Sequence, residues 1–220
     1  MAQLVNPGCR SGYGTTSGIM DMSHGLMPYG TPESAVINIA TAQMARFYRV
    51  PSRGTGGFTD ANTLDMQAGF ESALTTAAAV LGGIHMIIGA GGSLQNALGA
   101  SFEKFVVDND INGYIKRICE GVPFSPEMLA LDVIKSVGPA GHFLTEDHTL
   151  KHFRQHLFRP QVSNRQAYEA WAEAGCKPVH ERAREEARRI LKEHQPDPLP
   201  KNVEKELWAV VRVAEGRGET

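Results

Sequence analysis

The sequence has few cysteines and no excess of positive charge. Its 220 residues include three cysteines, Cys9, Cys119 and Cys176, and no C-x-x-C pair. Widely spaced cysteines in odd number provide neither a disulfide framework nor a zinc ribbon, so we expect a reducing, cytoplasmic location and no bound metal. The 22 Lys and Arg are outnumbered by 24 Asp and Glu, which argues against a nucleic-acid-binding surface.

Long hydrophobic runs are also missing. The most apolar stretch, residues 77–92, contains five glycines and is interrupted by His85. A membrane-spanning helix needs about 20 consecutive apolar residues, so we expect no membrane association. The N-terminus lacks a basic segment followed by a continuous apolar core, and we therefore identify no secretory signal.

Charged residues are concentrated in the second half of the chain. Residues 1–100 hold nine of them and residues 101–220 hold 37. The first half is rich in Gly, Ala, Thr and Met, a composition typical of strands and helices that are covered on most sides. The segment 161–220 carries acid–base pairs at helical spacing and indicates solvated helices.

Hydroxyl residues followed by acids mark the starts of several helices. Thr31, Ser125 and Thr145 stand at positions that predict N-caps, and Pro follows the first two. The residues expected on the apolar face of the first long helix, which runs to about Tyr48, are Val36, Ile39, Ala40, Gln43, Met44 and Phe47. Further helices are predicted near 64–81, 101–120, 126–137, 146–157, 165–194 and 202–214.

Short glycine-bounded segments between the first helices are predicted to be strands. They lie at 12–18, 50–58 and 84–88, and helices of crossover length separate them. Strands that alternate with helices in this way build a parallel sheet, so the fold class is α/β. The glycine-rich segment 89–93 lacks the spacing of a dinucleotide-binding fingerprint and the lysine of a phosphate-binding loop, and is predicted to be a tight strand-to-helix turn.

Several long motifs, in order along the chain, resemble one known family. They are Gly12-Tyr-Gly-Thr-Thr-Ser-Gly-Ile-Met-Asp21-Met, Gly56-Gly-Phe58-Thr-Asp60, Asp65-Met-Gln-Ala-Gly-Phe-Glu71, Ser101-Phe-Glu103-Lys-Phe-Val-Val-Asp108-Asn-Asp110 and the segment 131–150. These strings are similar to the trimethylamine methyltransferase family, which includes corrinoid-dependent enzymes acting on methylated amines and betaines.

The resemblance implies a fold and a reaction. Family members are TIM-barrel proteins of roughly twice this length, so the chain resembles the C-terminal half of a TIM (β/α)8 barrel with a C-terminal helical extension. The resemblance divides it into a partial barrel, 1–160, and a helical segment, 161–220. It also implies methyl transfer from a methylated amine to a corrinoid carried on a separate partner protein, so we expect no corrinoid bound tightly by this chain.

The sequence departs from the trimethylamine enzymes at Phe58. In those enzymes the resemblance places pyrrolysine here, and phenylalanine cannot form the covalent adduct attributed to that residue. A quaternary ammonium needs no such adduct, because its leaving group departs as a neutral tertiary amine. The betaine-type members are therefore the expected relatives, with Phe58 either facing the ammonium group or packing in the barrel core. Tyr13 and Tyr48 are weaker aromatic candidates.

Other candidate site residues have both a functional and a structural interpretation. His85 either contacts a substrate carboxylate or the corrinoid edge, or is a core histidine with a satisfied ring; Gly91 is a further candidate for corrinoid contact. Arg49 and Arg53 either bind a betaine carboxylate or stabilise the barrel. Asp60 either orients a ligand-binding loop or caps the next helix.

Other polar residues have a structural interpretation only, or a metal-binding alternative. Glu71 and Glu103 are expected to be helix-pair and macrodipole residues. His148, His152 and His156 recur at helical spacing, which either indicates a metal or, since no further ligand pattern accompanies them, a solvated or interface stripe.

Two functional hypotheses follow from the residues and the resemblance together. In the first, the chain is part of an amine or betaine methyltransferase that needs a corrinoid protein and a small methylated amine. In the second, it is a truncated, non-catalytic assembly partner. Three strand–helix units cannot close an eight-stranded barrel, so we expect either a homo-oligomer or a missing N-terminal half-chain to cover the exposed edges.

Overall fold

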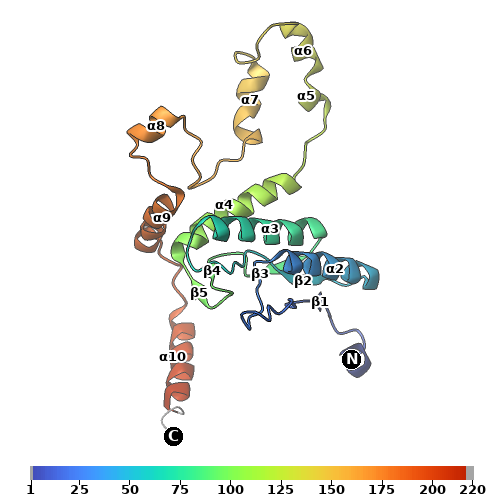
Figure 1. The fold of residues 1–220 in the computed structure, drawn as a ribbon, viewed down its shortest axis with the longest axis vertical. Helices are drawn as coiled ribbons and strands as arrows, with labels where there is room; N and C mark the ends of the chain where they lie inside the picture. Colours follow the sequence, from blue (N-terminus) through green and yellow to red (C-terminus); the bar gives the residue numbers. More distant parts are fainter. Residues whose placement is uncertain (1, 217–220) are drawn as a thin grey trace. The chain divides into compact units, whose positions relative to one another are not determined.

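A computed structural model describes residues 2–216 and contains short strands among longer helices (Figure 1). Its elements are α1 (Ala2–Val5), β1 (Tyr13–Gly14), α2 (Pro32–Tyr48), β2 (Ser52–Thr55), α3 (Met66–Gly82), β3 (Met86–Ile88), β4 (Ser93–Leu94), β5 (Gly99–Ala100), α4 (Phe102–Cys119), α5 (Pro126–Leu129), α6 (Leu131–Val137), α7 (Asp147–His156), α8 (Tyr168–Glu173), α9 (Val179–Glu193) and α10 (Lys201–Gly216).

Three parallel strands form the main sheet, in the order β1-β2-β3. Tyr13 pairs with Ser52, and Arg53 pairs with Met86. Helices α2 and α3 connect the strands, which confirms the predicted parallel α/β arrangement. The strands are shorter than the predicted segments, and within residues 2–216 the sheet does not close into a barrel.

Small polar residues attach α2 to the sheet. Asn38 is 1% exposed, its amide nitrogen donates to the Thr55 hydroxyl at 3.2 Å, and its oxygen accepts from the Thr55 amide at 3.0 Å. Gly54 leaves the space that Asn38 occupies. Because a buried amide with both groups hydrogen-bonded is specific for its position, these contacts fix α2 against β2.

The predicted apolar face of α2 is wrong. The buried residues of the helix are Ser34, Asn38, Thr41, Ala42 and Ala45. Val36 and Phe47, which were expected to be buried, are 63% and 75% exposed. The close approach of helix to sheet selects small side chains on the inner face, so hydrophobicity alone indicates the wrong side of α2.

Side-chain caps begin four of the helices. Thr31 caps α2, Ser101 caps α4 and Ser125 caps α5, each by accepting a hydrogen bond from a backbone amide of the first turn. These caps confirm the predicted starts, and Asp65 caps α3 in the same way. The predicted cap at Thr145 is wrong, since α7 begins after Glu146 without a side-chain cap bond.

The glycine-rich segment after β3 is not a simple strand-to-helix turn. It leads into a two-stranded antiparallel hairpin of β4 and β5 before α4 begins. Gln95, Asn96 and Ala97 at the hairpin tip all have positive φ, between 52° and 67°. The Gln95 and Asn96 amides donate to the carbonyls of Ala61 and Thr59, so the loop after β2 supports this strained turn.

Two of the predicted long helices are interrupted. Residues 126–137 form α5 and α6, which are separated by Ala130 at a φ of 49°. Residues 165–194 form α8 and α9, and Gly175 and Cys176 between them have φ of 90° and 54°. Left-handed residues end a helix, so each break replaces one continuous element by two.

The described residues form two compact units, divided between Ala187 and Arg188. The first contains the sheet and helices α2 to α8. The second contains α10, whose side chains Leu207 and Trp208 are 51% and 55% exposed. The predicted boundary at 160/161 stays a prediction. No helix in residues 2–216 is both long enough and apolar enough to cross a bilayer.

Asp110 anchors the segment after α7 to α4. Its carboxylate, 3% exposed, accepts hydrogen bonds from the amides of Gln161, Val162 and Ser163 at 2.6, 3.0 and 2.9 Å. Val162 in turn packs with Val106, Ala183 and Ala187. One buried carboxylate therefore holds a loop that completes the core between α4 and α9.

Replacing Asp110 by alanine is expected to lower the free energy of unfolding by about 2–4 kcal/mol, because the amides of 161–163 would lose a charged acceptor. Urea denaturation measures this change. Asn109→Ala, at the exposed neighbouring position, is the control and should change stability by less than about 0.5 kcal/mol. Equal effects of the two substitutions would contradict the anchoring role.

Candidate functional site

The loops after β1 and β2 bring an aromatic pair to the carboxyl end of the sheet. Phe58 follows β2 and is half-buried. Its ring lies 5.3 Å from the ring of Tyr29, at an interplanar angle of 35°. Gly89, directly after β3, lies so close to the Phe58 ring that a Cβ would not fit there. Ligands of parallel α/β folds bind at this end of the strands.

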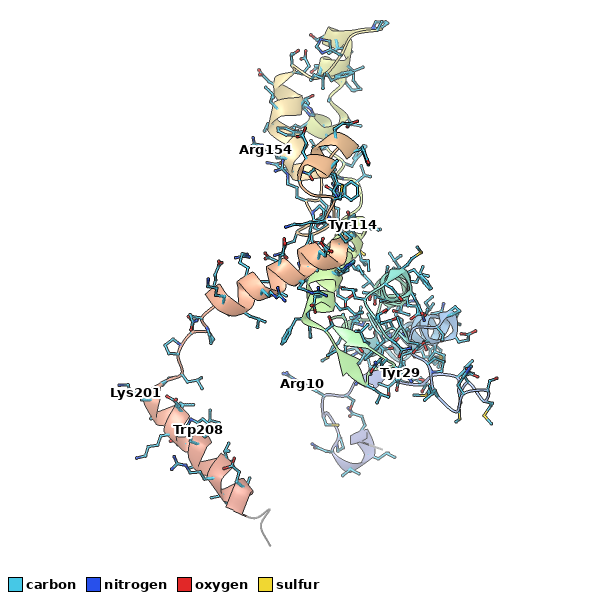
Figure 2. The ribbon with its side chains drawn as sticks, turned by 60° about the vertical axis from the view of Figure 1, so that its left-hand side comes forward. Arg10, Tyr29, Tyr114, Arg154, Lys201 and Trp208 are labelled. Carbon is cyan, nitrogen blue, oxygen red and sulfur yellow. The ribbon has the colours of Figure 1, made fainter. Side chains whose placement is uncertain are left out.

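A carboxylate fixes Tyr29 beside Phe58. The two oxygens of Asp60 accept hydrogen bonds from the backbone amides of Tyr29 and Gly30, at 3.0 and 3.1 Å. Tyr29 lies among the side chains packed around the strands (Figure 2). Asp60 therefore orients the loop before α2. The alternative of helix capping is wrong, because Asp65 caps α3.

Glu71 of α3 holds Asp60 in place. Its Oε2 accepts from the Thr59 hydroxyl at 2.5 Å and from the Asp60 amide at 2.9 Å, and its Oε1 accepts from Gln67 at 2.8 Å. The predicted helix-pair role is thus only part of its function in the fold. Burial raises the pKa of Asp60 above its ordinary value, and the negative charge of Glu71 adds to this effect.

Removing the charge of Glu71 is expected to lower the pKa of Asp60. In Glu71→Gln this pKa should fall, because the charge of Glu71 adds to the effect of burial in raising it, while the hydrogen bonds from the Tyr29 and Gly30 amides lower it. A ¹³C NMR titration of the aspartate carboxyls measures the shift. An unchanged or higher pKa of Asp60 in the variant would show that the two carboxylates do not interact.

The raised pKa also sets the sign of a pH effect on stability. Since folded Asp60 holds its proton more tightly than the unfolded chain, its contribution to stability is fully present below the unfolded pKa of about 4. The contribution is lost as the pH rises through the folded pKa. In Asp60→Asn this part of the pH dependence should disappear from denaturation curves; its persistence would assign it to another group.

A cavity of about 600 Å³ lies beside Asp60. Its lining consists of Asp21, His24, Leu26, Pro28, Thr31, Asp60, Asn62, Gln95, Asn96 and Leu98. Asp21 Oδ2 lies 2.6 Å from His24 Nδ1, and this hydrogen bond lowers the pKa of Asp21. The lining contains two carboxylates and no lysine or arginine, so the cavity favours neutral or cationic groups.

A buried ion pair contacts the two loops that follow β2 and β3. Lys104 of α4 is 0% exposed, and its Nζ lies 2.6 Å from Asp108 Oδ2. The Lys104 ammonium also donates to the Gly57 carbonyl and the Ser72 hydroxyl, at 3.1 and 2.9 Å. Asp108 accepts from the Gly92 amide at 2.7 Å. Burial raises the pKa of Asp108, an effect that the charge of Lys104 opposes.

Three of the predicted site residues lie at the amino end of the strands instead. Arg49 ends α2 in the left-handed conformation. His85 precedes β3, and its Nδ1 accepts from the Ser52 amide at 3.2 Å. Arg53 is exposed. It lies on one face of β2, and Gly54 lies on the other face, against α2. Their ligand contacts stay predictions, and the ring contact of His85 with Ser52 supports its structural interpretation.

The remaining predicted residues are placed as follows. Gly91 lies at the carboxyl end of β3, against the ring of Phe105. Tyr13 contacts Tyr48 at 6.1 Å between ring centroids, so neither pairs with Phe58. Glu103 stands in the first turn of α4, as predicted; hydrogen bonds from its own backbone amide, Ser101 and Arg184 lower its pKa.

The histidine stripe of α7 faces α5. The rings of His148 and His152 are 4.5 Å apart, and those of His152 and His156 are 5.6 Å apart. Glu127 of α5 accepts from Lys151 and lies 3.1 Å from His152 Nε2. Residues 2–216 contain no group of three or more side chains that could hold a metal ion. The contacts of His148 and His152 with Glu127 support the interpretation as an interface stripe.

Sequence reasoning missed Tyr29, Lys104 and Asp108. The spacing of Lys104 and Asp108, four residues apart on a helix, is typical of a solvated surface pair, so only their apolar neighbours Val106 and Val107 signalled burial. For Tyr29 the available signal was its position in the loop between β1 and α2, at the same sheet end as Phe58.

Comparison with known proteins places the chain in one family. The family model described as trimethylamine methyltransferase (MTTB) matches residues 1–216. A glycine betaine methyltransferase of Desulfitobacterium hafniense is 40% identical over 211 residues, which are 96% of this chain and 44% of that protein.

Trimethylamine methyltransferases are similar over nearly the same length. One from Desulfitobacterium hafniense is 37% identical over 98% of this chain and 43% of its own length, and one from Methanosarcina barkeri is 36% identical over the same shares of the two chains. The chain spans less than half the length of these relatives. It belongs to the trimethylamine methyltransferase family, as the resemblance indicated.

Proposed function

We propose that the chain contributes the carboxyl-end residues of a methyltransferase that acts on a quaternary methylated amine of the betaine type. The observation that carries this proposal is Phe58, held at the end of β2 against Tyr29. Aromatic faces attract ammonium cations by about 0.5–2 kcal/mol, depending on desolvation. The similarity to a glycine betaine methyltransferase supports the same substrate class.

The methyl acceptor in this proposal is the corrinoid of a separate partner protein. The methyl group leaves nitrogen without its electron pair, the amine departs neutral, and the reduced cobalt supplies the two electrons of the new bond. The residues of this chain bind and orient the donor. Phe58 and Tyr29 would contact the ammonium group, Asp60 would hold Tyr29, and Gly91, after β3, would face the acceptor.

The sheet also supports a proposal about assembly. Arg53 and Met86 pair on the face of the sheet opposite Gly54, and Met86 is 61% exposed. A parallel sheet of this kind is stable when both faces are covered. We propose that further barrel strands cover this face, supplied either by a second copy of this chain or by a separate N-terminal half-chain. Some of the residues that position the substrate would then come from outside this copy of the chain.

A substrate panel tests the proposed function. The chain is produced together with the remaining barrel segment of a family relative, and methylation of cob(I)alamin is followed by absorbance with glycine betaine, carnitine and trimethylamine. We expect turnover with at least one betaine and none with trimethylamine. Turnover with trimethylamine alone would contradict the quaternary-ammonium proposal. Absence of turnover with every donor would support the alternative, a non-catalytic assembly partner.

A further inference from the structure

The ion pair of Lys104 and Asp108 connects the two loops that surround Phe58. The Lys104 ammonium donates a hydrogen bond to the carbonyl of Gly57, the residue directly before Phe58. Asp108 reaches the Gly92 amide, in the loop that begins at Gly89 against the Phe58 ring. One pair of side chains on α4 therefore contacts the backbone on both sides of the aromatic residue.

All three protons of the Lys104 ammonium have acceptors in this network. They go to Gly57, Ser72 and Asp108. The Ser72 hydroxyl also donates to the Gly57 carbonyl at 3.1 Å, and Ser72 is 0% exposed. With its full set of partners fixed by geometry, the ammonium group determines where the Gly57 peptide lies.

Stability alone does not account for such a pair. Two charges lose their hydration on burial, and apolar side chains of similar volume often replace a buried ion pair without loss of stability. Asp108 also leaves Oδ1 buried without a hydrogen-bond partner among the described residues. An arrangement that is electrostatically costly, and that joins two loops at the proposed site, indicates a role in positioning.

We propose that Lys104 and Asp108 are positioning residues that set the Phe58 ring for the substrate cation without contacting the substrate. The expected effect on catalysis rests on the proposed function. The expected effect on the structure of the two loops rests on the hydrogen-bond network alone. The two effects are measured separately, so that the failure of one is distinguishable from the failure of the other.

The structural test is hydrogen exchange in the double variant Lys104→Met/Asp108→Leu, whose side chains replace the charges with similar volume. The amides of Asp60, Gln95 and Asn96 are bonded to Glu71, Ala61 and Thr59, and none of them to the ion pair. We expect these amides to exchange at least about tenfold faster while α2 exchanges as in the wild type, since local opening differs from global unfolding. Unchanged exchange in a folded double variant would overturn the proposal.

The matched control is Arg189→Met/Glu193→Leu on α9. This pair has the same four-residue spacing, but its side chains are 53% and 58% exposed. It should leave the exchange of Asp60, Gln95 and Asn96 unchanged. If the buried double variant does not fold, Ser72→Ala removes only the hydroxyl shared by Lys104 and Gly57; faster exchange of the three amides then supports the proposal, and wild-type exchange overturns it.

The catalytic test measures KM and kcat of the double variant Lys104→Met/Asp108→Leu with glycine betaine. The chain is again produced together with the remaining barrel segment of a family relative. Because the ammonium charge is partly lost in the transition state, Phe58 would stabilise the bound ground state at least as much as the transition state, so KM should rise by about threefold or more and kcat should not fall. A fall in kcat with unchanged KM would overturn positioning of Phe58. If the wild type turns over no amine, the proposed function has failed, and the exchange measurement still decides the role of the pair.

Discussion

Phe58→Ala is expected to weaken binding of glycine betaine by about 2- to 30-fold in the chain produced together with the remaining barrel segment of a family relative. The factor corresponds to the loss of about 0.5–2 kcal/mol of cation–aromatic attraction. Isothermal titration measures the dissociation constant without requiring methyl transfer. The ring of Phe58 packs against Tyr29 and Gly89. The circular dichroism spectra of the variant and the wild type should therefore be compared first, to show that the variant is folded.

Two further variants separate cation binding from packing. Phe58→Tyr keeps an aromatic face and should bind within about threefold of the wild type. Tyr48→Ala removes an aromatic ring at the other end of the strands, where it contacts Tyr13, and should leave affinity unchanged. An unchanged affinity in Phe58→Ala would support the other interpretation, in which Phe58 packs in the core and does not contact the substrate.

The isolated chain is expected to show methyl transfer at least about 10³-fold slower than the completed protein. Holding donor and acceptor in line supplies a large part of such rate enhancements, and Arg53 and Met86 of the sheet are left exposed by residues 2–216. Full activity of the isolated chain, or of its self-associated form, would show that strands from another chain are not required.

The isolated chain is also expected to self-associate. Besides the open sheet face, the outer sides of α2 and α3 expose Val36, Phe47, Phe70, Leu74 and Leu81. Apolar patches of this kind on a soluble protein mark contact surfaces. Sedimentation velocity should detect oligomers, with Phe47→Glu and Met86→Glu reporting which surface is used. A monomer that unfolds cooperatively and binds no apolar dye would contradict this expectation.

Local signals predicted the helices and the order of the strands because those features depend on neighbouring residues. Thr31 followed by Pro32 begins α2, and Ser101 begins α4, at the predicted positions. Strands 12–18, 50–58 and 84–88 were located correctly because glycines and crossover helices bound them, although hydrogen bonding extends over only part of each.

Features that depend on tertiary contacts were not predictable in the same way. The inner face of α2 carries Asn38 and small residues because the helix lies close to Gly54, and hydrophobic periodicity does not encode that distance. The hairpin after β3 depends on hydrogen bonds from Gln95 and Asn96 to the loop after β2. Neither partner segment has a local strand pattern.

The candidate site shows the same division. Phe58 and Asp60 were identified from the sequence, since both follow a predicted strand directly. Their partners come from elsewhere in the chain: Tyr29 lies 31 residues before Asp60, and Lys104 lies 47 residues after Gly57. These contacts become visible only when parallel strands bring their carboxyl ends together.

The most direct test of the account is to follow the methyl group itself. Glycine betaine labelled with ¹³C in its methyl groups is incubated with the completed protein and cob(I)alamin, and the products are separated and analysed by NMR. We expect labelled methyl on cobalt and an equal amount of dimethylglycine, both reduced in Lys104→Met/Asp108→Leu at low substrate concentration. Tight binding of glycine betaine with no label on cobalt would contradict the proposed methyl transfer.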